Sequence, residues 1–444
     1  MRLARALRIK RGDVVAFVGA GGKSSAIRTL SKELSTHFPI LISTTTKLRL
    51  DQADLAQKHL VLDSKKIKEC VPELLQECDF ILVTKGRDAK EPKWLGLETG
   101  EVRDLIHFVK REDAVLLLEA DGARGKSLKA PSAHEPVLPA ECDLVVPVVG
   151  LDVVGEKLPS PLVHRQELVS ELLHLANGES ISSEHIIKII RSEQGGLKGI
   201  SPSAKVRVLL NKADTSPDLE RGYEIALGLL AESRIQSVLL ASVLKESTVH
   251  ESIGRVAGIV LAAGRSSRME GLKQFIHFRG KPMVLQSIDA ALGAGLDPVV
   301  MVTGEEGMMP ETLEDLPILT VENPQPEEGQ SSSIRLGLDA IRDQTEAAVF
   351  FLADMPLIST DLVKALVKRH RQTLAPIILP IAGGRRGNPV LFDQATFDNL
   401  RRLQGDRGGR ALFDQYVIEH VEWDESIHFD VDSEDDLSKL REIE

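Results

Sequence analysis

Short apolar runs rich in β-branched residues recur along the 444-residue chain and constrain its fold more than any other feature. Stretches with helical periodicity, such as residues 24–38 and 184–194, separate several of them. This alternation is typical of parallel strands covered by helices on both faces of a sheet. In the first half of the chain the predicted strands are residues 13–19, 40–44, 80–84, 114–122, 143–150, 206–214 and 236–242.

The same pattern restarts in the second half, after a polar stretch at residues 241–255. Its predicted strands are residues 256–262, 299–304, 347–354 and 376–381, with a helix expected over 359–372. We place the boundary near Gly254. The sequence therefore predicts an α/β protein with two Rossmann-like three-layer domains, residues 1–252 and 253–444, in which ligands bind at strand-end loops.

The charge balance limits the classes of partner. Lys and Arg number 55 against 66 Asp and Glu, so the net charge is −11. Proteins that bind nucleic acid or membrane surfaces generally need a broad basic face, so we expect neither partner and predict small-molecule substrates. Cys70, Cys78 and Cys142 form no CxxC pair. With no secretory signal or membrane-spanning stretch, they indicate a reducing cytoplasm.

Residues 258–284, GIVLAAGRSSRMEGLKQFIHFRGKPMV, place small residues and cations directly after an apolar run. The run closes at Ala262–Gly264, and Arg265, Arg268, Lys273 and Arg279 follow. Converging backbone amides and nearby cations can hold phosphate oxygens. Taken alone, the loop leaves phosphate binding and a chance glycine loop equally open.

Carboxylates later in the second half suggest a metal site. Asp354 directly follows an apolar strand, where it could reach a divalent ion or cap a turn. Asp430 and Asp432 alternate along a predicted strand and would share one face. Two further glycine loops, residues 384–392 and 403–413, are rich in arginine.

These motifs together resemble one family. LAAGRSSRMEGLK is similar to the LAAGxSxRMGxxK signature of MobA-like nucleotidyltransferases, and DMP, RGNP, GDRGGR and DVDSEDDL follow in the expected order over residues 256–440. The double alanine and the RGNP loop most resemble the molybdenum cofactor cytidylyltransferases (MocA). One departure is Glu270, which stands where the signature has glycine and places a carboxylate beside the expected phosphate loop.

This resemblance implies transfer of CMP from CTP to molybdopterin with release of pyrophosphate, driven by positioning and charge neutralisation. It implies Mg²⁺ held by Asp354 and Asp432. The residues that it implies for the triphosphate are Lys273 and Arg268, with the amides of Ala263, Gly264 and Arg265. Those that it implies for the pterin and base pockets are Asn388, within 386–389, and Ser331, Ser332 and Ser333, although Ser332 could equally cap a helix.

Residues 13–27, DVVAFVGAGGKSSAI, indicate a strand, a glycine loop, Lys-Ser and a helix. The loop is shorter than the ordinary Walker pattern, which has glycine where this chain has Phe17. The amides from Gly19 to Lys23, which include Gly21 and Gly22, could still cradle phosphates. Lys23 would neutralise them, and Ser24 would contact magnesium.

Two further strand ends of the first half fit a nucleotide site. Glu119 and Asp121 end an apolar strand, the Walker-B arrangement for magnesium or water, with Asp121 as the expected magnesium ligand. Residues 211–214 have the form NKxD. In that form Asn211 would support the glycine loop beside Lys212, and Asp214 would bind guanine.

The blocks EADGARGKSLKAPSAHEP (119–136), HRQELV (164–169) and GGLKG (195–199) resemble the YqeC family over about residues 8–245. That family is described as accessory to selenium-dependent molybdenum hydroxylases. The resemblance implies a P-loop NTPase-like domain that binds GTP or ATP and leaves hydrolysis open. Ligand-binding and structural roles both stay open for His134, Glu135, His164 and Arg165.

Together the two resemblances predict a protein of molybdenum hydroxylase maturation, with an apo-hydroxylase as a partner. Two alternatives remain. One is a low-turnover chaperone that binds the cofactor and hands it to the hydroxylase. The other is a nucleotidyltransferase for a different phosphate or alcohol acceptor.

Overall fold

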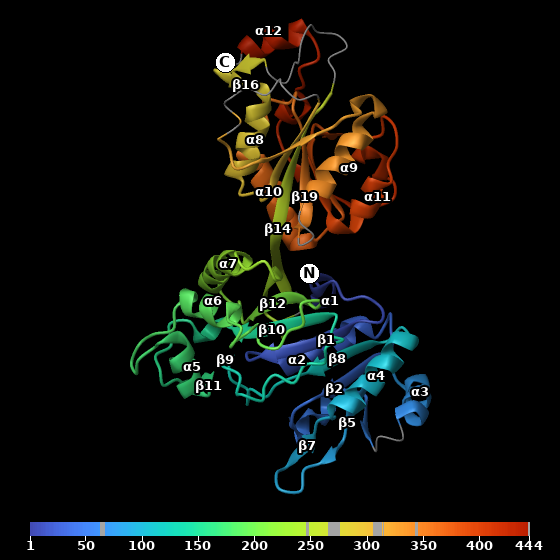
Figure 1. Cartoon of the computed structure of the whole chain (residues 1–444), viewed down its shortest axis with the longest axis vertical. Coiled ribbons are helices and arrows are strands. Elements are labelled where there is room, and N and C mark those ends of the chain that lie inside the picture. Colours follow the sequence, from blue (N-terminus) through green and yellow to red (C-terminus); the bar gives the residue numbers. More distant parts are fainter. Residues whose placement is uncertain are drawn as a thin grey trace. The chain divides into compact units, whose positions relative to one another are not determined.

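The computed structural model describes residues 1–62, 67–245, 248–264, 276–304, 313, 315–341 and 345–442. The chain divides into two compact units, Met1–Ile253 and Gly254–Glu444 (Figure 1). One strand, β14 (Val249–Ala262), belongs to both. The second half's first strand was expected to begin at residue 256, so its start was predicted seven residues too late. The first residues of the strand were missed because several of them are polar, although Val249 and Ile253 are buried.

The first unit contains a sheet whose strands pair in parallel from β13 to β4. Its order is β14, β13 (Ile235–Ala241), β12 (Lys205–Asn211), β10 (Leu144–Gly150), β1 (Val14–Gly19), β8 (Val115–Glu119), β2 (Ile40–Thr44), β5 (Phe80–Thr84) and β4 (Lys58–Val61). The predicted parallel sheet and its seven strands are confirmed. β4 was not predicted, because its sequence KHLV is short and partly exposed.

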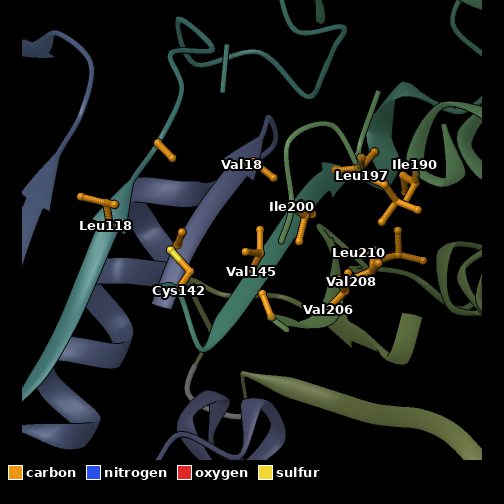
Figure 2. Close-up of a cluster of buried hydrophobic side chains, with 14 of the residues drawn as sticks. Val18, Leu118, Cys142, Val145, Ile190, Leu197, Ile200, Val206, Val208 and Leu210 are labelled. Atoms are coloured by element: carbon orange, nitrogen blue, oxygen red, sulfur yellow. The ribbon is translucent and has the colours of Figure 1, made fainter. Parts of the chain in front are cut away.

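Helices cover both faces of this sheet. On β1, Val15 and Phe17 pack with α1 and α2, whereas Ala16 and Val18 pack with the helices of the opposite face. The helices are α1 (Leu3–Leu7), α2 (Lys23–Leu34), α3 (Ile67–Glu77), α4 (Thr99–Arg111), α5 (Gln166–Leu173), α6 (Ser183–Arg191) and α7 (Ser216–Leu230). Figure 2 shows part of the core on the face opposite α1 and α2. Its side chains come from neighbouring strands and from α6, and they include Val18, Leu118, Val145, Val208 and Ile190.

The second unit is also an α/β sheet with helices on both faces. Its order is β18 (Leu319–Glu322), β17 (Val299–Thr303), β14, β19 (Thr345–Leu352), β22 (Val390–Asp393), β20 (Ile377–Ala382) and β23 (Ile418–Glu422). β22 runs antiparallel to both neighbours, and the other pairs in this order are parallel. One face carries α8 (Met283–Gly293) and α10 (Thr360–Thr373), and the other carries α9 (Gln330–Ala340) and α11 (Phe397–Arg401).

The segment before α12 (Glu434–Glu442) differs from the prediction. Residues 429–432 form no strand, so the argument that alternation places Asp430 and Asp432 on one face does not hold. Only Val431 of these residues is fully buried, and its amide donates to the carbonyl oxygen of Asp354 at 3.0 Å. Across the described parts of both units, no helix combines the length and apolar character needed to cross a membrane.

Candidate functional site

The glycine loop of the first unit joins β1, which ends at Gly19, to α2, which begins at Lys23. Gly21 and Gly22 have φ angles of 99° and 126°, which L-residues with side chains rarely adopt. A Cβ atom on Gly22 would lie 2.3 Å from Nδ2 of Asn211. The loop therefore needs glycine for its backbone conformation and for the close approach of Asn211.

Most amides of this loop already have acceptors within the protein. Those of Gly19, Ala20 and Gly21 donate to Oδ2 of Asp121 (2.9 Å), the carbonyl of Val148 (2.9 Å) and the carbonyl of Lys126 (2.8 Å). The site is thus narrower than the expected cradle from Gly19 to Lys23. α2 begins without a side-chain cap, so its first amides are the donors open to an anion.

Lys23 is buried, with 4% of its surface exposed. Its Nζ donates to the Gly19 carbonyl at 2.6 Å and lies 3.0 Å from Oδ1 of Asp121. Burial lowers the pKa of Lys23, but the neighbouring Asp121 and Glu119 carboxylates outweigh burial, and the pKa is raised overall. The ammonium group is therefore charged and held at the loop.

A chain of alternating charges continues from Lys23. Asp121 lies 3.1 Å from Lys129, whose Nζ lies 2.7 Å from Glu135. Arg165 donates to both carboxylate oxygens of Glu135, at 3.0 Å for Oε1. Burial alone would raise the pKa of Glu135, but Arg165 and Lys129 lower it to about 2. Each charge in this chain therefore has a neighbour of opposite sign, which is the arrangement that buried charges need.

Lys23, Glu135 and Arg165 of this chain of charges line cavity A, a hollow of about 1340 Å³ in the first unit. Its lining includes the glycine loop, residues 122–126 and 163–167, and Lys212. Of the candidate set noted in the sequence, the structure brings Glu135, His164 and Arg165 to this cavity. His134 is exposed and is not part of the lining. Burial and the adjacent Arg165 lower the pKa of His164.

Ser24 and Glu119 line cavity A together. The Ser24 hydroxyl donates to Oε2 of Glu119 at 2.9 Å and accepts from Gln52 at 2.8 Å. Burial raises the pKa of Glu119. Asp121, the predicted metal ligand, is 2% exposed and lies between two lysines outside the lining. The sequence drew attention to Glu119 and Asp121 together, but only Asp121 was chosen as the metal ligand, although Glu119 is the last residue of β8.

The NKxD residues separate in space. Asn211 donates to the Gly21 carbonyl at 2.7 Å and accepts from the Val243 amide at 3.0 Å, so it supports the glycine loop. Lys212 pairs with Asp152 at 2.7 Å and lines cavity A. The Asp214 side chain is 51% exposed, pairs with Lys245 at 3.0 Å and does not line the cavity.

In the second unit, Ala263 and Gly264 at the end of β14 line cavity C, of about 450 Å³. Asp354 and Ser333 line it as well. The predicted triphosphate ligands Arg265, Arg268 and Lys273, like Glu270, lie outside the described residues. The described part of the phosphate loop therefore reaches the same cavity as the predicted metal ligand.

The hydrogen bond from Val431 to Asp354 brings the two predicted metal segments together. Asp432 is exposed, and Asp430 lines a second cavity of this unit, called cavity B. Within the described residues no group of three or more His, Cys, Asp or Glu could hold a metal. Mg²⁺ prefers one or two carboxylates together with substrate phosphate oxygens, so a sparse carboxylate set fits this ion.

Cavity B, of about 780 Å³, combines apolar walls with a few polar groups. Its walls include Leu261, Ile334, Phe350 and Val390, and its polar lining includes Asn388, Arg407 and Arg410. Such a composition suits a planar ring that carries an anionic group. Cavities B and C adjoin, since both are lined by Leu261, Gln330, Leu352 and Asp406.

The predicted serines at the beginning of α9 are mostly internal. Ser331 and Ser332 are 1% and 4% exposed and line neither cavity B nor cavity C. The Ser332 hydroxyl donates to the carbonyl of Gly329, just before α9, at 2.8 Å and accepts from Asn323. Sequence reasoning missed Gln330 and Asp406, which line both cavities. Their signals were their places beside the serine run and within GDRGGR.

Two known families match the chain. The YqeC protein family matches residues 15–167, and the MobA-like NTP transferase domain matches residues 258–421. The sequence therefore joins a region that matches the YqeC family to a later region that matches the MobA-like NTP transferase domain. This confirms the two resemblances that the motifs carried, and their order along the chain.

Individual relatives follow the same division. The YqeC protein of Escherichia coli (strain K12) is 26% identical over 204 residues, which is 46% of this chain and 77% of that protein. A probable molybdenum cofactor guanylyltransferase of Thermococcus sibiricus is 28% identical over 198 residues, 41% of this chain and 96% of that protein. The chain spans only 26% and 28% of the bifunctional GlmU proteins of Carboxydothermus hydrogenoformans and Geotalea uraniireducens.

Among solved structures, Rv0371c from Mycobacterium tuberculosis H37Rv is 25% identical to this chain. The match covers 42% of this chain and 98% of that protein, with a TM-score of 0.38.

Proposed function

We propose that the second unit transfers CMP from CTP to the phosphate of molybdopterin and releases pyrophosphate, as part of molybdenum hydroxylase maturation. The observation that carries this proposal is the meeting of cavities B and C, with Asp354 lining one and the apolar, arginine-bearing walls lining the other. The MobA-like domain and the name of the Thermococcus relative support the reaction class.

In this proposal the triphosphate lies in cavity C beside Gly264, and the pterin ring lies against the apolar walls of cavity B. A phosphate oxygen of the acceptor attacks the α-phosphorus while the bond to the pyrophosphate oxygen breaks. Arg407 and Arg410 orient the acceptor phosphate, and the apolar walls exclude water from it. Asp354, with Asp430 or Asp432, would hold Mg²⁺, which would supply charge neutralisation.

A second candidate donor is GTP. The similarity to a protein named as a probable guanylyltransferase favours it. The choice of CTP instead depends on the double alanine before Gly264 and on the loop that contains Asn388. The reaction is the same for either base, so product identity separates the two candidates.

For the first unit we propose binding of a purine nucleotide at the beginning of α2, in support of the same maturation. The first amides of α2 and Lys23 would hold its phosphates, and Ser24 with Glu119 would hold Mg²⁺. The support is the uncapped helix start beside a charged lysine and cavity A. Hydrolysis and delivery to an apo-hydroxylase belong to this hypothesis as later steps.

The test is incubation of the full chain with Mg²⁺, molybdopterin and each of the four NTPs, followed by mass spectrometry of the pterin product. We expect a CMP adduct and pyrophosphate with CTP. A GMP adduct from GTP, with no adduct from the other three NTPs, would establish the second candidate. Tight pterin binding without pyrophosphate release from any NTP would contradict nucleotidyl transfer and favour the chaperone alternative.

A further inference from the structure

The walls of cavity A carry an excess of positive charge in a chain whose net charge is −11. Nine lysines and arginines line the cavity. Seven of them pair with carboxylates, as Lys47 does with Asp88 at 2.7 Å and Lys212 does with Asp152 at 2.7 Å. The two that remain, Arg124 and Lys126, are therefore of interest.

Arg124 and Lys126 lie in one loop, and neither forms an ion pair with the described residues. Lys126 Nζ donates to the carbonyl of Pro161 at 2.6 Å, a neutral acceptor. The Lys126 amide donates to the Ala123 carbonyl at 3.0 Å, and its own carbonyl accepts from the Gly21 amide at 2.8 Å. The loop is thus fixed to the glycine loop, and its two cations have no carboxylate partner among the residues that the structure describes.

We propose that Arg124 and Lys126 form a second anion site in cavity A, which takes the phosphate or carboxylate group of a small molecule distinct from the nucleotide. This inference rests on the proposed nucleotide binding in the first unit. A guanidinium binds either oxyanion in a two-point fork, and an ammonium adds a point charge.

The size of the cavity supports two ligands. Ligand pockets commonly measure about 300–1,000 Å³, and cavity A, at about 1340 Å³, is larger. The nucleotide phosphates would take the beginning of α2, where Lys23 and Ser24 lie. The loop with Arg124 and Lys126 contacts the glycine loop through the hydrogen bond from the Gly21 amide to the Lys126 carbonyl. The second anion would therefore bind next to the nucleotide phosphates.

The experiment uses the full chain, with isothermal titration of inorganic phosphate into protein saturated with a non-hydrolysable GTP or ATP analogue and Mg²⁺. The variant is Arg124→Gln/Lys126→Gln. The matched control is Lys47→Gln, which removes a cation that lines the same cavity but pairs with Asp88. We expect phosphate to bind the double variant at least tenfold more weakly, with nucleotide affinity unchanged within twofold and the control like wild type.

A tenfold loss of nucleotide affinity with unchanged phosphate binding would overturn the proposal, because the pair would then serve the nucleotide. Equal phosphate binding by all three proteins would overturn it too. A parallel titration with succinate distinguishes a carboxylate ligand from a phosphate ligand. If no nucleotide binds, or if Lys23→Ala does not weaken its binding, the nucleotide proposal fails. Phosphate titration of the nucleotide-free chain, with the same variant and control, then decides the anion site by itself.

Discussion

The glycine loop of the first unit and the strand ends of the second unit balance their charges differently. In the first unit, Lys23, Asp121, Lys129 and Glu135 neutralise one another in sequence before any ligand is present. In the second, Arg407 and Arg410 line cavity B and form no ion pair within the described part of the chain.

This difference in charge pairing indicates that the two sites have different roles. Charges that are paired and buried hold their geometry without a ligand, and a ligand must compete with those pairs for Lys23. Arginines that have no ion pair among the described residues can be neutralised by the substrate, which suits a site where charge develops on a transferred phosphate. We therefore expect mutations at the second site to affect turnover, and mutations in the first to affect affinity and stability.

The largest effect is expected from Asp354→Asn in the second unit. Loss of the carboxylate beside cavity C removes the main proposed metal ligand, and we expect nucleotidyl transfer to fall by about 1,000-fold, the size typical for loss of one strong electrostatic contact in a transition state. Pyrophosphate release with CTP and molybdopterin measures it.

Asp361→Asn is the matched control, since Asp361 is an exposed carboxylate in the first turn of α10. Its turnover should match that of wild type, and both variants should keep the wild-type melting temperature within a few degrees. Wild-type turnover in Asp354→Asn would remove Asp354 from the metal site.

Lys23→Ala tests the independence of the two units. The proposed phosphate contact of Lys23 is a charge-assisted bond at a buried position, and we expect nucleotide affinity of the first unit to fall by about 100-fold. Nucleotidyl transfer should stay within twofold of wild type. A parallel loss of transfer would show that the two sites depend on each other. Equilibrium binding, with and without molybdopterin, measures the nucleotide affinity, and pyrophosphate release measures the transfer.

Glu135→Gln tests the paired charges through pH. The folded pKa of about 2 lies below the ordinary value of 4.5, so ionised Glu135 stabilises the first unit above pH 4.5, and the stabilisation is lost as pH falls toward 2. The shift corresponds to about 2–3 kcal/mol after allowance for partial exposure. The variant should be less stable at pH 7 and approach wild type near pH 2.

Hydrogen exchange of first-unit peptides in denaturant, at several pH values, measures this difference. Glu141→Gln, which removes an exposed carboxylate 3.2 Å from Arg103, serves as the control and should show little change. A constant difference between Glu135→Gln and wild type across this pH range would contradict the assigned pairing.

Much of the fold could be predicted because its central strands are continuous apolar runs. β1, β8 and β10 are buried along nearly their whole length, and burial on both faces leaves a direct trace in the sequence. The start of β14 places the half-buried His250 and Glu251 between buried residues, and the edge strand β4 has no fully buried residue, so no continuous apolar run marked either of them. The extended segment at Asp430 was mistaken for a strand because alternation alone does not show sheet pairing.

The site could be predicted only in part. The glycine loop, Lys23 and Asp354 stand at strand ends, which sequence reasoning can locate. Which of two neighbouring side chains faces a cavity depends on packing. Glu119 lines cavity A while Asp121 is enclosed by lysines that come from α2 and from residue 129, far apart in sequence. Ser332 is likewise drawn inward by Asn323, a contact that no motif indicates.

The smallest effect is expected at Asp214. If Asp214 bound guanine, its substitution would strongly lower the affinity for GTP. The Asp214 side chain is, however, half exposed, pairs with Lys245 and lies outside the lining of cavity A. We therefore expect Asp214→Ala to change the affinity for GTP and ATP by less than twofold.

Asn211→Ala, which removes the hydrogen bonds to Gly21 and Val243, should lower the affinity for both nucleotides about tenfold, because it loosens the loop that holds their phosphates. Competition binding with the two nucleotides measures both variants. A selective loss of GTP in Asp214→Ala would show that ligand binding draws Asp214 to the base, so that the paired arrangement of the first unit changes on binding.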